Sequence, residues 1–584
     1  MSFFATIPPV KAPRKSRLLV LLTSTVWIVA LVLLFPSMPT LHEDAPPHDR
    51  ILYIFFLCMV AYFWLFSSYH LATFITWWAS HQLVSTDKVL PPLGNEPAVA
   101  IAYTVFNDFI EECAASCLEV EYRNYHLFVC DDSTDASMRD RVTGFAVANR
   151  DRCTLVRRSQ QTDFKAGNLN HLLTGLPAQY EYLLLVDSDS MIAPGFLRSA
   201  ASALQRDRTL AFVQACHSAY IPATATSFQR AVGPGVQCMW RFMSVKNRYG
   251  MAPMFGHGVL LAIKALNAAG NFPLRVSEDL ALTARLRTCG YGGVIADSVW
   301  CKEGIPATFG QYRRRFEKWV IGTLEFVLKD ARQFFKNHVI SLGEKLDLAF
   351  SLLGLLNVLV LLTFVVVVNV VWPMTSGIWR VATLEVKSLG VSTVFPMLDI
   401  TGLLQGRVTL GPRLAVCIAS LASLVYFLPD LRRYPIRTVA HISNGFTCFC
   451  GVLVPCFLSS LLSVATGRYI FRVTGDMTES ARWRRGWGNL ADNFYVGRKG
   501  SVAIEIFFGC AAFSWAILSG NLFLAAIALG IWIAPLLERL GWESLPAVLL
   551  RHVPFSLFFL QLWFIAFPGL GSAGLTNQVV LIHF

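Results

Sequence analysis

The chain has 584 residues, of which 54% are hydrophobic, and its mean hydropathy of +0.50 is too high for an ordinary soluble protein. Several windows exceed the roughly 18 apolar residues that can cross a bilayer, so the composition indicates an integral membrane protein. The net charge of +12 does not imply a nucleic-acid partner, because the basic residues gather where apolar segments meet the cytoplasm, as positive-inside bias predicts.

The first 90 residues predict a cytoplasmic tail and two membrane-spanning helices. The first span, 18–35, follows the basic segment 11–17, which places the N-terminus in the cytoplasm. No small-residue cleavage site follows this span, and a second span at 51–67 comes soon after. We therefore expect a retained anchor and not a signal peptide.

Residues 91–325 have a mixed composition and predict a cytoplasmic α/β domain. Strand-like apolar segments alternate with helical patterns, which favours a largely parallel sheet. The strand-like segments are 98–104, 126–130, 154–157, 182–186 and 211–215, and the helical patterns cover 109–120 and 137–148.

Carboxylates follow three of these strands. Asp108 follows the first and Asp131 the second, and the apolar run 182–186 ends at Asp187 and Asp189. Open α/β sheets bind ligands at the carboxyl ends of their strands, so we expect these groups at one edge. Asp187 and Asp189 face the same way and suit a hard divalent cation, although a simple exposed turn would explain this pair alone equally well.

A lysine is the expected phosphate contact, because the chain has no glycine-rich phosphate-binding loop of the P-loop or dinucleotide type. The candidate is Lys165 in the sequence DFKAGNLN, where Gly167 permits close backbone approach.

The order of these motifs resembles that of membrane-embedded family 2 glycosyltransferases of the cellulose synthase and hyaluronan synthase type, as in bacterial β-glucan synthases. The similarity covers about residues 96–500. The matching segments are Thr104–Asp108, Asp131–Asp135, Lys165–Asn170, Asp187–Asp189, Ser277–Asp279 and a variant at Arg315–Trp319. The resemblance implies a glycosyltransferase A-type α/β domain inserted in a helical transmembrane bundle of about seven spans plus interfacial helices.

The resemblance also implies roles for the donor-side residues. Asp108 and Asp131 would contact the uridine of a UDP-sugar, and Asp187 and Asp189 would hold the sugar and the metal on its diphosphate. Mg²⁺ or Mn²⁺ suits such an all-oxygen site. Asp279 matches the catalytic base of the family, with an N-terminal helix cap as the structural alternative.

On the acceptor side, Glu278 is expected to orient its neighbour Asp279, and Gly256 and His257 match a loop that approaches the acceptor sugar. His257 has a helix-capping or core role as its alternative. The family's usual QxxRW motif is altered at Arg315–Trp319. Arg315 or Lys318 would still lie near the diphosphate, and Trp319 would stack on the acceptor sugar. An interfacial amphipathic helix would explain the same three residues.

The remaining chain predicts membrane and interface segments. Residues 326–347 predict interfacial helices, 348–470 transmembrane helices with an interfacial or re-entrant segment at 442–465, and 501–584 the C-terminal transmembrane helices. Expected spans are 348–372, 414–428, 502–519, 522–537 and 553–567. The segment 471–500 resembles a gating loop over the nucleotide, through Phe471, Val473 and Thr474, although Asp476 stands near the position of the family's lysine.

The expected function is inverting transfer of a hexose, glucose first, from a UDP-sugar to a growing β-linked polysaccharide that passes through the bundle. The expected location is the bacterial inner membrane, with the bilayer and accessory secretion subunits as further partners. No nucleic acid and no cyclic-dinucleotide receptor domain are expected. The alternatives are single glycosylation of a lipid acceptor and an inactive translocation or scaffold subunit. The 14 cysteines lack paired CxxC spacing, and we expect buried, reduced thiols at Cys113, Cys117, Cys448 and Cys450.

Overall fold

The computed structural model describes residues 15–38, 40–83, 96–376, 378–386, 391–399, 404–405, 410–469, 498–519 and 521–567. These residues fall into two compact units. The soluble unit centres on residues 76–355, and the membrane unit holds residues 20–75, 356–462 and the described residues from 498 onward.

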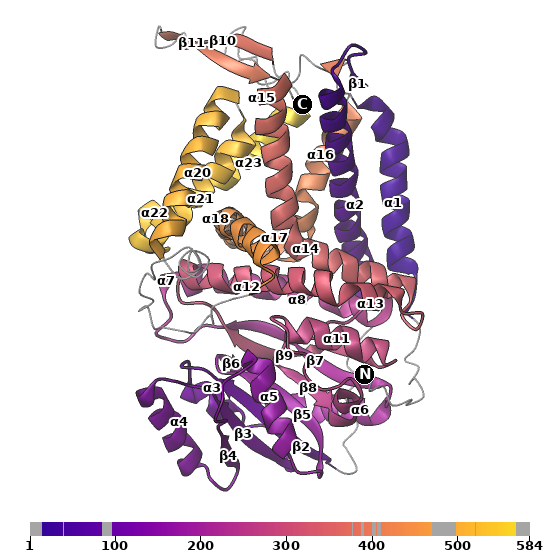
Figure 1. Cartoon of the computed structure of the whole chain (residues 1–584), viewed down its shortest axis with the longest axis vertical. Coiled ribbons are helices and arrows are strands. Elements are labelled where there is room, and N and C mark those ends of the chain that lie inside the picture. The colour runs from indigo at the N-terminus through magenta and orange to yellow at the C-terminus, as the bar shows by residue number, and fades with distance from the viewer. Residues whose placement is uncertain are drawn as a thin grey trace. The chain divides into compact units, whose positions relative to one another are not determined.

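An eight-stranded mixed sheet forms the centre of the soluble unit (Figure 1). Its strand order is β4-β3-β2-β5-β8-β7-β9-β6. The strands are β2 (Ala98–Val105), β3 (Tyr125–Asp131), β4 (Cys153–Val156), β5 (Tyr180–Asp187), β6 (Ser190–Met191), β7 (Leu210–Tyr220), β8 (Val259–Ala262) and β9 (Gly292–Gly304). The neighbours from β4 to β5 are parallel, as the sequence predicts, whereas β8 is antiparallel to β5 and β7. This arrangement is a GT-A-like mixed sheet.

Helices cover both faces of this sheet. On one face lie α3 (Glu111–Ser116), α4 (Ala136–Ala148) and α6 (Phe196–Arg206), and on the other α5 (Phe164–Gly175), α10 (Ile263–Ala268) and α11 (Glu278–Thr288). The same unit also contains α7 (Ser227–Val232), α8 (Val236–Trp240), α9 (Lys246–Tyr249), α12 (Phe309–Lys329) and α13 (Ala331–Lys336). Helix α12 runs across the domain boundary expected at residue 325.

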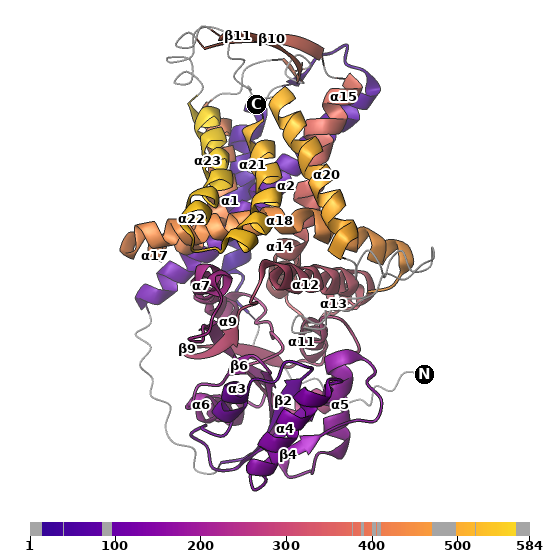
Figure 2. The same ribbon diagram turned by 90° about the vertical axis from the view of Figure 1, so that its left-hand side faces the viewer.

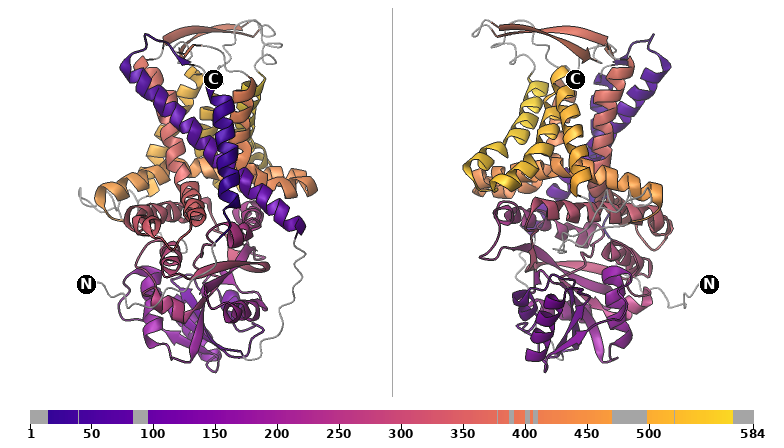
Figure 3. Two further views of the ribbon diagram at one scale, coloured as in Figure 1. Left: turned by 90° about the vertical axis from the view of Figure 1, so that its right-hand side faces the viewer. Right: turned by 60° about the vertical axis from the view of Figure 1, so that its left-hand side comes forward.

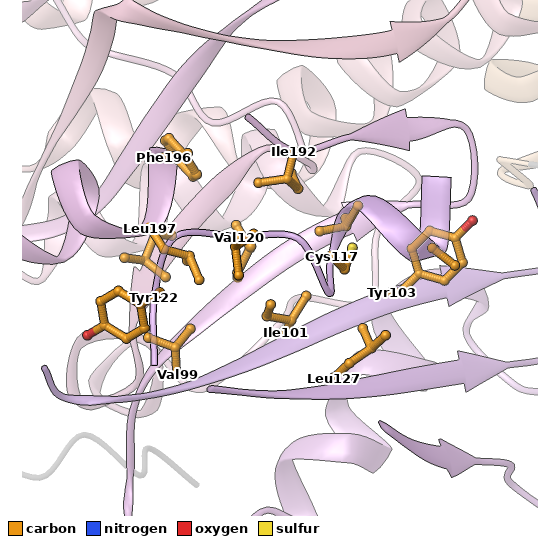
Figure 4. Close-up of a cluster of buried hydrophobic side chains, with 14 of the residues drawn as sticks. Val99, Ile101, Tyr103, Cys117, Val120, Tyr122, Leu127, Ile192, Phe196 and Leu197 are labelled. Atoms are coloured by element: carbon orange, nitrogen blue, oxygen red, sulfur yellow. The ribbon is translucent and has the colours of Figure 1, made fainter. Parts of the chain in front are cut away.

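Strand β2 divides the core because its successive side chains point to opposite faces. Val99, Ile101 and Tyr103 pack on one face with α3, α4 and α6, and Figure 4 shows Val99 near Leu197 of α6 at one end of this cluster and Tyr103 near Cys117 at the other. The small residues of β2 on the other face pack with α5, α10 and α11. Burial on both faces explains why β2 and β5 read as continuous apolar runs in the sequence.

The register of the parallel strands brings their acidic ends together. Thr104 of β2 pairs with Asp187 of β5, and Val105 pairs with Asp131 of β3. The three carboxylate-bearing strand ends therefore lie at one edge of the sheet, as the sequence predicts.

The membrane unit is built from long apolar helices. Seven helical segments of the described chain are long and apolar enough to cross a membrane, namely 18–37, 47–80, 342–376, 410–433, 435–466, 522–540 and 545–566. Helices α1 (Leu18–Leu34) and α2 (Pro47–Leu83) cross each other (Figure 3). Trp27 Nε1 of α1 donates to the carbonyl of Ala61 of α2 at 2.9 Å.

Two segments differ from the expected spans. Helix α18 (Pro435–Thr466), expected to be interfacial or re-entrant, passes the length and composition test for a span, but Figure 2 shows it lying crosswise to α21 (Leu522–Leu540) and α23 (Val553–Ala566). Helix α20 (Arg498–Ser519), expected to cross, has a shorter apolar core at 506–517. The interfacial role of α18 stays a prediction.

Other elements were not expected from the sequence. Strands β10 (Ile378–Val386) and β11 (Val391–Asp399) form an antiparallel pair. Along the chain they come after α14 (Leu342–Val366) and before α16 (Leu410–Leu421). Cys113, Cys117, Cys448 and Cys450 are buried, as expected, and each is free in the structure.

Candidate active site

Asp187 lies at the end of β5 with two donors on one of its oxygens. Its Oδ1 accepts hydrogen bonds from Lys165 Nζ at 2.5 Å and from Thr104 Oγ1 at 3.1 Å. Burial alone would raise the pKa of Asp187, but the Lys165 ammonium outweighs burial and holds this pKa well below its usual range. Asp187 is therefore a carboxylate, and its side chain remains 33% exposed.

Lys165, in the first turn of α5, connects three parts of the site. Besides Asp187, its Nζ donates to the carbonyl of Gly256 at 2.8 Å and lies 3.8 Å from Glu278 Oε1. Burial opposes its charge, but Asp187 and Glu278 outweigh burial and raise the pKa of Lys165. The ammonium is thus a fixed cation between β5, the loop at Gly256 and the start of α11.

Asp189 is paired with α12. Arg315 Nη2 donates to Asp189 Oδ2 at 3.1 Å, and Arg315 Nη1 donates to the carbonyl of Gly304 at 3.0 Å. A Cβ at Gly304 would lie 2.6 Å from Asp189 Cβ, so this close passage of β9 requires glycine. Burial raises the pKa of Asp189, and Arg315 only partly offsets that effect.

Asp279 lies in the first turn of α11, against Gly256. Its Oδ1 accepts from the Leu280 N–H at 2.7 Å, and a Cβ at Gly256 would lie 3.4 Å from its Oδ2. The N-cap position of α11 is Ser277, which makes no side-chain cap hydrogen bond, and Asp279 accepts from a first-turn N–H, so both its expected role as base and its capping alternative stay predictions. Burial, followed by the neighbouring Glu278, raises the pKa of Asp279 to about 6. A general base acts best with a pKa near the working pH, and Asp279 meets that condition.

Asp108 and Asp131 come from the ends of the neighbouring strands β2 and β3, and Asp108 is close enough to Asp187 and Asp189 for their charges to act on it. Asp108 Oδ1 accepts from the Phe106 N–H at 2.7 Å, and burial raises the pKa of Asp108 to about 7. Asp131 forms an ion pair with Arg157 at 2.7 Å and accepts from the Ser133 N–H at 2.9 Å. Asp131 is therefore held by its own loop, and Arg157 is a neighbour that the sequence analysis missed.

Asn107 joins the two strand-end loops. It has a positive φ of 56°, and its Oδ1 accepts from the N–H groups of Thr134 and Asp135, each at 2.9 Å. A positive φ is tolerated best by glycine and asparagine, which explains the residue type at this position.

His257 belongs to a buried polar cluster. Its Nε2 lies 3.3 Å from Glu303 Oε2, and its Nδ1 lies 3.0 Å from Ser190 Oγ. The His217 ring stacks on it with a centroid separation of 4.2 Å. His217 and Glu303 are 86 residues apart and were not singled out from the sequence, because neither belongs to a local motif.

Helix α12 presents Lys318 and Trp319 beyond Arg315. The charge of Lys318 adds a small effect to the lowered pKa of Asp187 and partly offsets the raised pKa of Asp279, so it acts on the same site. Trp319 is 43% exposed, and its ring lies 6.1 Å from that of Phe316. The structure thus brings Arg315, Lys318 and Trp319 into one helix beside the carboxylates. Phe471, Val473 and Thr474 of the expected gating loop lie outside the described residues.

Asp187 and Asp189 fit a divalent cation such as Mg²⁺ or Mn²⁺. Both side chains are 33% exposed, and they offer the all-oxygen donors that these hard ions prefer. His217, His257 and Glu303 form another candidate group, with one ligand atom of each within 4.8 Å of the others.

The chain matches two overlapping family models. Residues 98–252 match Glycosyl transferase family 2, and residues 182–430 match Glycosyl transferase family group 2. Together these matches make residues 98–430 similar to family 2 glycosyltransferase domains.

The relatives include two plant proteins from Arabidopsis thaliana. Probable glucomannan 4-beta-mannosyltransferase 14 is 27% identical over 312 residues, covering 48% of this chain and 55% of that protein. Glucomannan 4-beta-mannosyltransferase 9 is 23% identical over 333 residues, covering 53% and 60%. The chain thus matches little more than half the length of these relatives.

Among solved structures, the mannosyltransferase PcManGT from Pyrobaculum calidifontis in complex with GDP-Man and Mn²⁺ matches with a TM-score of 0.40 and 15% identity. The match covers 68% of this chain and 96% of that one.

Proposed function

We propose that this protein transfers a hexose from a nucleoside diphosphate sugar to the hydroxyl of a growing β-linked glycan, with inversion at the anomeric carbon. One observation carries the proposal. Lys165 contacts both Asp187 and the carbonyl of Gly256, while Asp279 lies against Gly256. A phosphate-binding cation, a metal-binding carboxylate and a candidate base therefore share one site.

Asp279 is the proposed base. Its carboxylate takes the proton of the acceptor hydroxyl as that oxygen attacks the anomeric carbon from the face opposite the leaving group. Glu278 raises the pKa of Asp279 by its charge, which strengthens the base. Gly256, His257 and Trp319 form the acceptor side, where the exposed ring of Trp319 offers a flat face for a sugar.

The leaving group is a nucleoside diphosphate, and its charge must be balanced. A divalent ion held by Asp187 and Asp189 would supply Lewis-acid neutralisation of this charge. Lys165, Arg315 and Lys318 add cationic groups on the same side. Asp108 and Asp131 are the proposed contacts of the nucleoside, with Asp131 oriented by Arg157.

The resemblance of the motifs favours UDP-glucose as the donor and a bacterial β-glucan as the product, whereas the names of the plant relatives favour mannosyl transfer. We place the catalytic domain in the cytoplasm of a bacterium and the helical bundle in its inner membrane, where the glycan would cross, with accessory secretion subunits as partners. Single transfer to a lipid is the second candidate, because a membrane-bound domain also reaches lipid acceptors.

The test is transfer by the purified protein in lipid vesicles. Radiolabelled UDP-glucose and GDP-mannose would be supplied with Mg²⁺ or Mn²⁺, with EDTA as the control, and the products would be sized. Polymer formation with either donor supports the proposal, and short lipid-extractable product supports the lipid acceptor. Absence of nucleoside diphosphate release with every donor would support the inactive scaffold alternative and remove the enzyme proposal.

A further inference from the structure

Four side chains from two strands and one loop form a continuous hydrogen-bonded chain beside the turn that carries Asp187 and Asp189. Gln214 and His217 lie on β7, Glu303 on β9, and His257 in the loop before β8. His217 Nδ1 lies 3.0 Å from Glu303 Oε2, and the two histidine rings share that carboxylate oxygen. Gln214 and His217 have no solvent exposure.

Backbone contacts fix the orientation of the Gln214 amide. Its Oε1 accepts from the Phe255 N–H at 2.9 Å, and its Nε2 donates toward the carbonyls of His257 at 2.9 Å and Gly258 at 3.1 Å. If the amide were turned over, its NH₂ group would face the Phe255 N–H, and its oxygen would face the carbonyl oxygens of His257 and Gly258.

This orientation decides the tautomer of His217. Gln214 Nε2 faces His217 Nε2 at 3.2 Å, and since an amide nitrogen only donates, His217 Nε2 must accept. The proton of the neutral ring then lies on Nδ1 and points to Glu303. Burial, followed by the neighbouring His257, lowers the pKa of His217 to about 4, so the ring is neutral. His217 Nδ1 then donates to Glu303 Oε2, and the four side chains form one hydrogen-bonded relay.

The relay ends at the turn that carries the metal-binding carboxylates. Glu303 of β9 pairs with Ser190, which follows Asp189, and the Gly304 N–H donates to the carbonyl of Asp189 at 2.8 Å. His257 Nδ1 reaches Ser190 Oγ at 3.0 Å. The relay thus braces the Asp187–Asp189 turn through both the backbone of β9 and the side chain of Ser190.

The same relay braces the loop before β8. Gly258 has a φ of +58°, and a Cβ there would lie 2.7 Å from His217 Nε2. The loop therefore packs directly on the relay, and its Gly256 carbonyl accepts from Lys165.

We propose that Gln214, His217 and Glu303 are positioning residues that hold His257 and the Asp187–Asp189 turn in the arrangement that binds a divalent ion with a nucleoside diphosphate. The proposal rests on the proposed function of the site. Side chains that support metal ligands indirectly typically affect metal affinity by about 10- to 100-fold.

The test measures Mn²⁺ binding by the full-length protein in detergent, in the presence of UDP or GDP. Binding is read as the decrease of the electron paramagnetic resonance signal of free Mn²⁺. Glu303→Gln keeps the shape and removes the charge, and His217→Ala removes one donor to Glu303. Each should weaken Mn²⁺ binding by about 10- to 100-fold. His126→Ala, on β3 where Nε2 contacts Thr154 Oγ1, is the matched histidine control and should bind normally.

Thermal melting without metal separates positioning from stability. If Glu303→Gln melts like the unsubstituted protein but binds Mn²⁺ more weakly, the relay positions the site. Unchanged Mn²⁺ affinity in both variants would overturn the proposal. It would also be overturned if the purified protein contained stoichiometric zinc and the His217→Ala variant lost that zinc. If the unsubstituted protein bound no Mn²⁺ with either nucleotide, the proposed function itself would fail.

Discussion

Lys165 Nζ lies 2.5 Å from Asp187 Oδ1 and 2.8 Å from the carbonyl oxygen of Gly256. The contact joins a helix start to a strand end 22 residues later. It also places a cation between the candidate metal ligand and the candidate base, and the proposed chemistry depends on this arrangement.

Lys165→Met should lower transfer by about 100-fold or more, because it removes a preorganised donor that faces developing negative charge. The rate of nucleoside diphosphate release at saturating donor measures this effect. Lys264→Met on α10 is the control and should leave the rate unchanged. Equal rates for Lys165→Met and the control would exclude a role for Lys165 in catalysis.

The rate of hexose transfer should fall on the acid side of about pH 6, the pKa to which burial and then Glu278 raise Asp279, and this fall is the acid limb of the pH profile. The base acts only when deprotonated, so the rate should be level above this pKa and fall roughly tenfold per pH unit below it. Because the charge of Glu278 raises this pKa, Glu278→Gln should move the limb to lower pH. A limb that stays in place in Glu278→Gln would assign the titration to another group.

Arg315→Gln should reduce transfer by about 10- to 100-fold, since a hydrogen bond to a charged group contributes about 1.5–3 kcal/mol. Arg315 neutralises Asp189 and also donates to the Gly304 carbonyl. Arg332→Gln, exposed on α13, is the control. If both variants keep full activity, the contact of Arg315 with Asp189 has no role in transfer.

A buried ion pair should make a large contribution to the free energy of unfolding of the soluble unit. Lys246 Nζ lies 2.8 Å from both carboxylate oxygens of Asp347, and the Met251 N–H also donates to Asp347. Asp347→Ala removes the carboxylate that pairs with this buried lysine and should cost about 3–5 kcal/mol, seen as a lower melting temperature.

The control for that measurement is the exposed pair Arg208–Glu181, whose charged atoms are 4.0 Å apart. Glu181→Gln should change stability by at most about 1 kcal/mol. Similar melting temperatures for the two variants would contradict the importance of the buried pair.

The sequence predicted the elements whose patterns are local. Strands β2 and β5 are buried on both faces, so their continuous apolar runs were recognisable, and the acidic residues after them marked the sheet edge. Strand β8 has only four residues, which gives too short a pattern to separate it from a loop or helix start.

The contacts within the site were less predictable because they join distant parts of the chain. Arg315 and Asp189 are 126 residues apart, and His217 and Glu303 are 86 apart. Neither pairing follows from periodicity. The altered motif at Arg315 showed which residue types were available but not that Arg315 would reach Asp189.

The most direct test of the central claim compares the unsubstituted protein with Asp279→Asn in lipid vesicles. Radiolabelled hexose transfer and binding of nucleoside diphosphate would be measured on the same preparations. Asp279→Asn should lose transfer by a factor of about 10² or more while it still binds UDP or GDP. Transfer by Asp279→Asn at the unsubstituted rate would contradict the central claim.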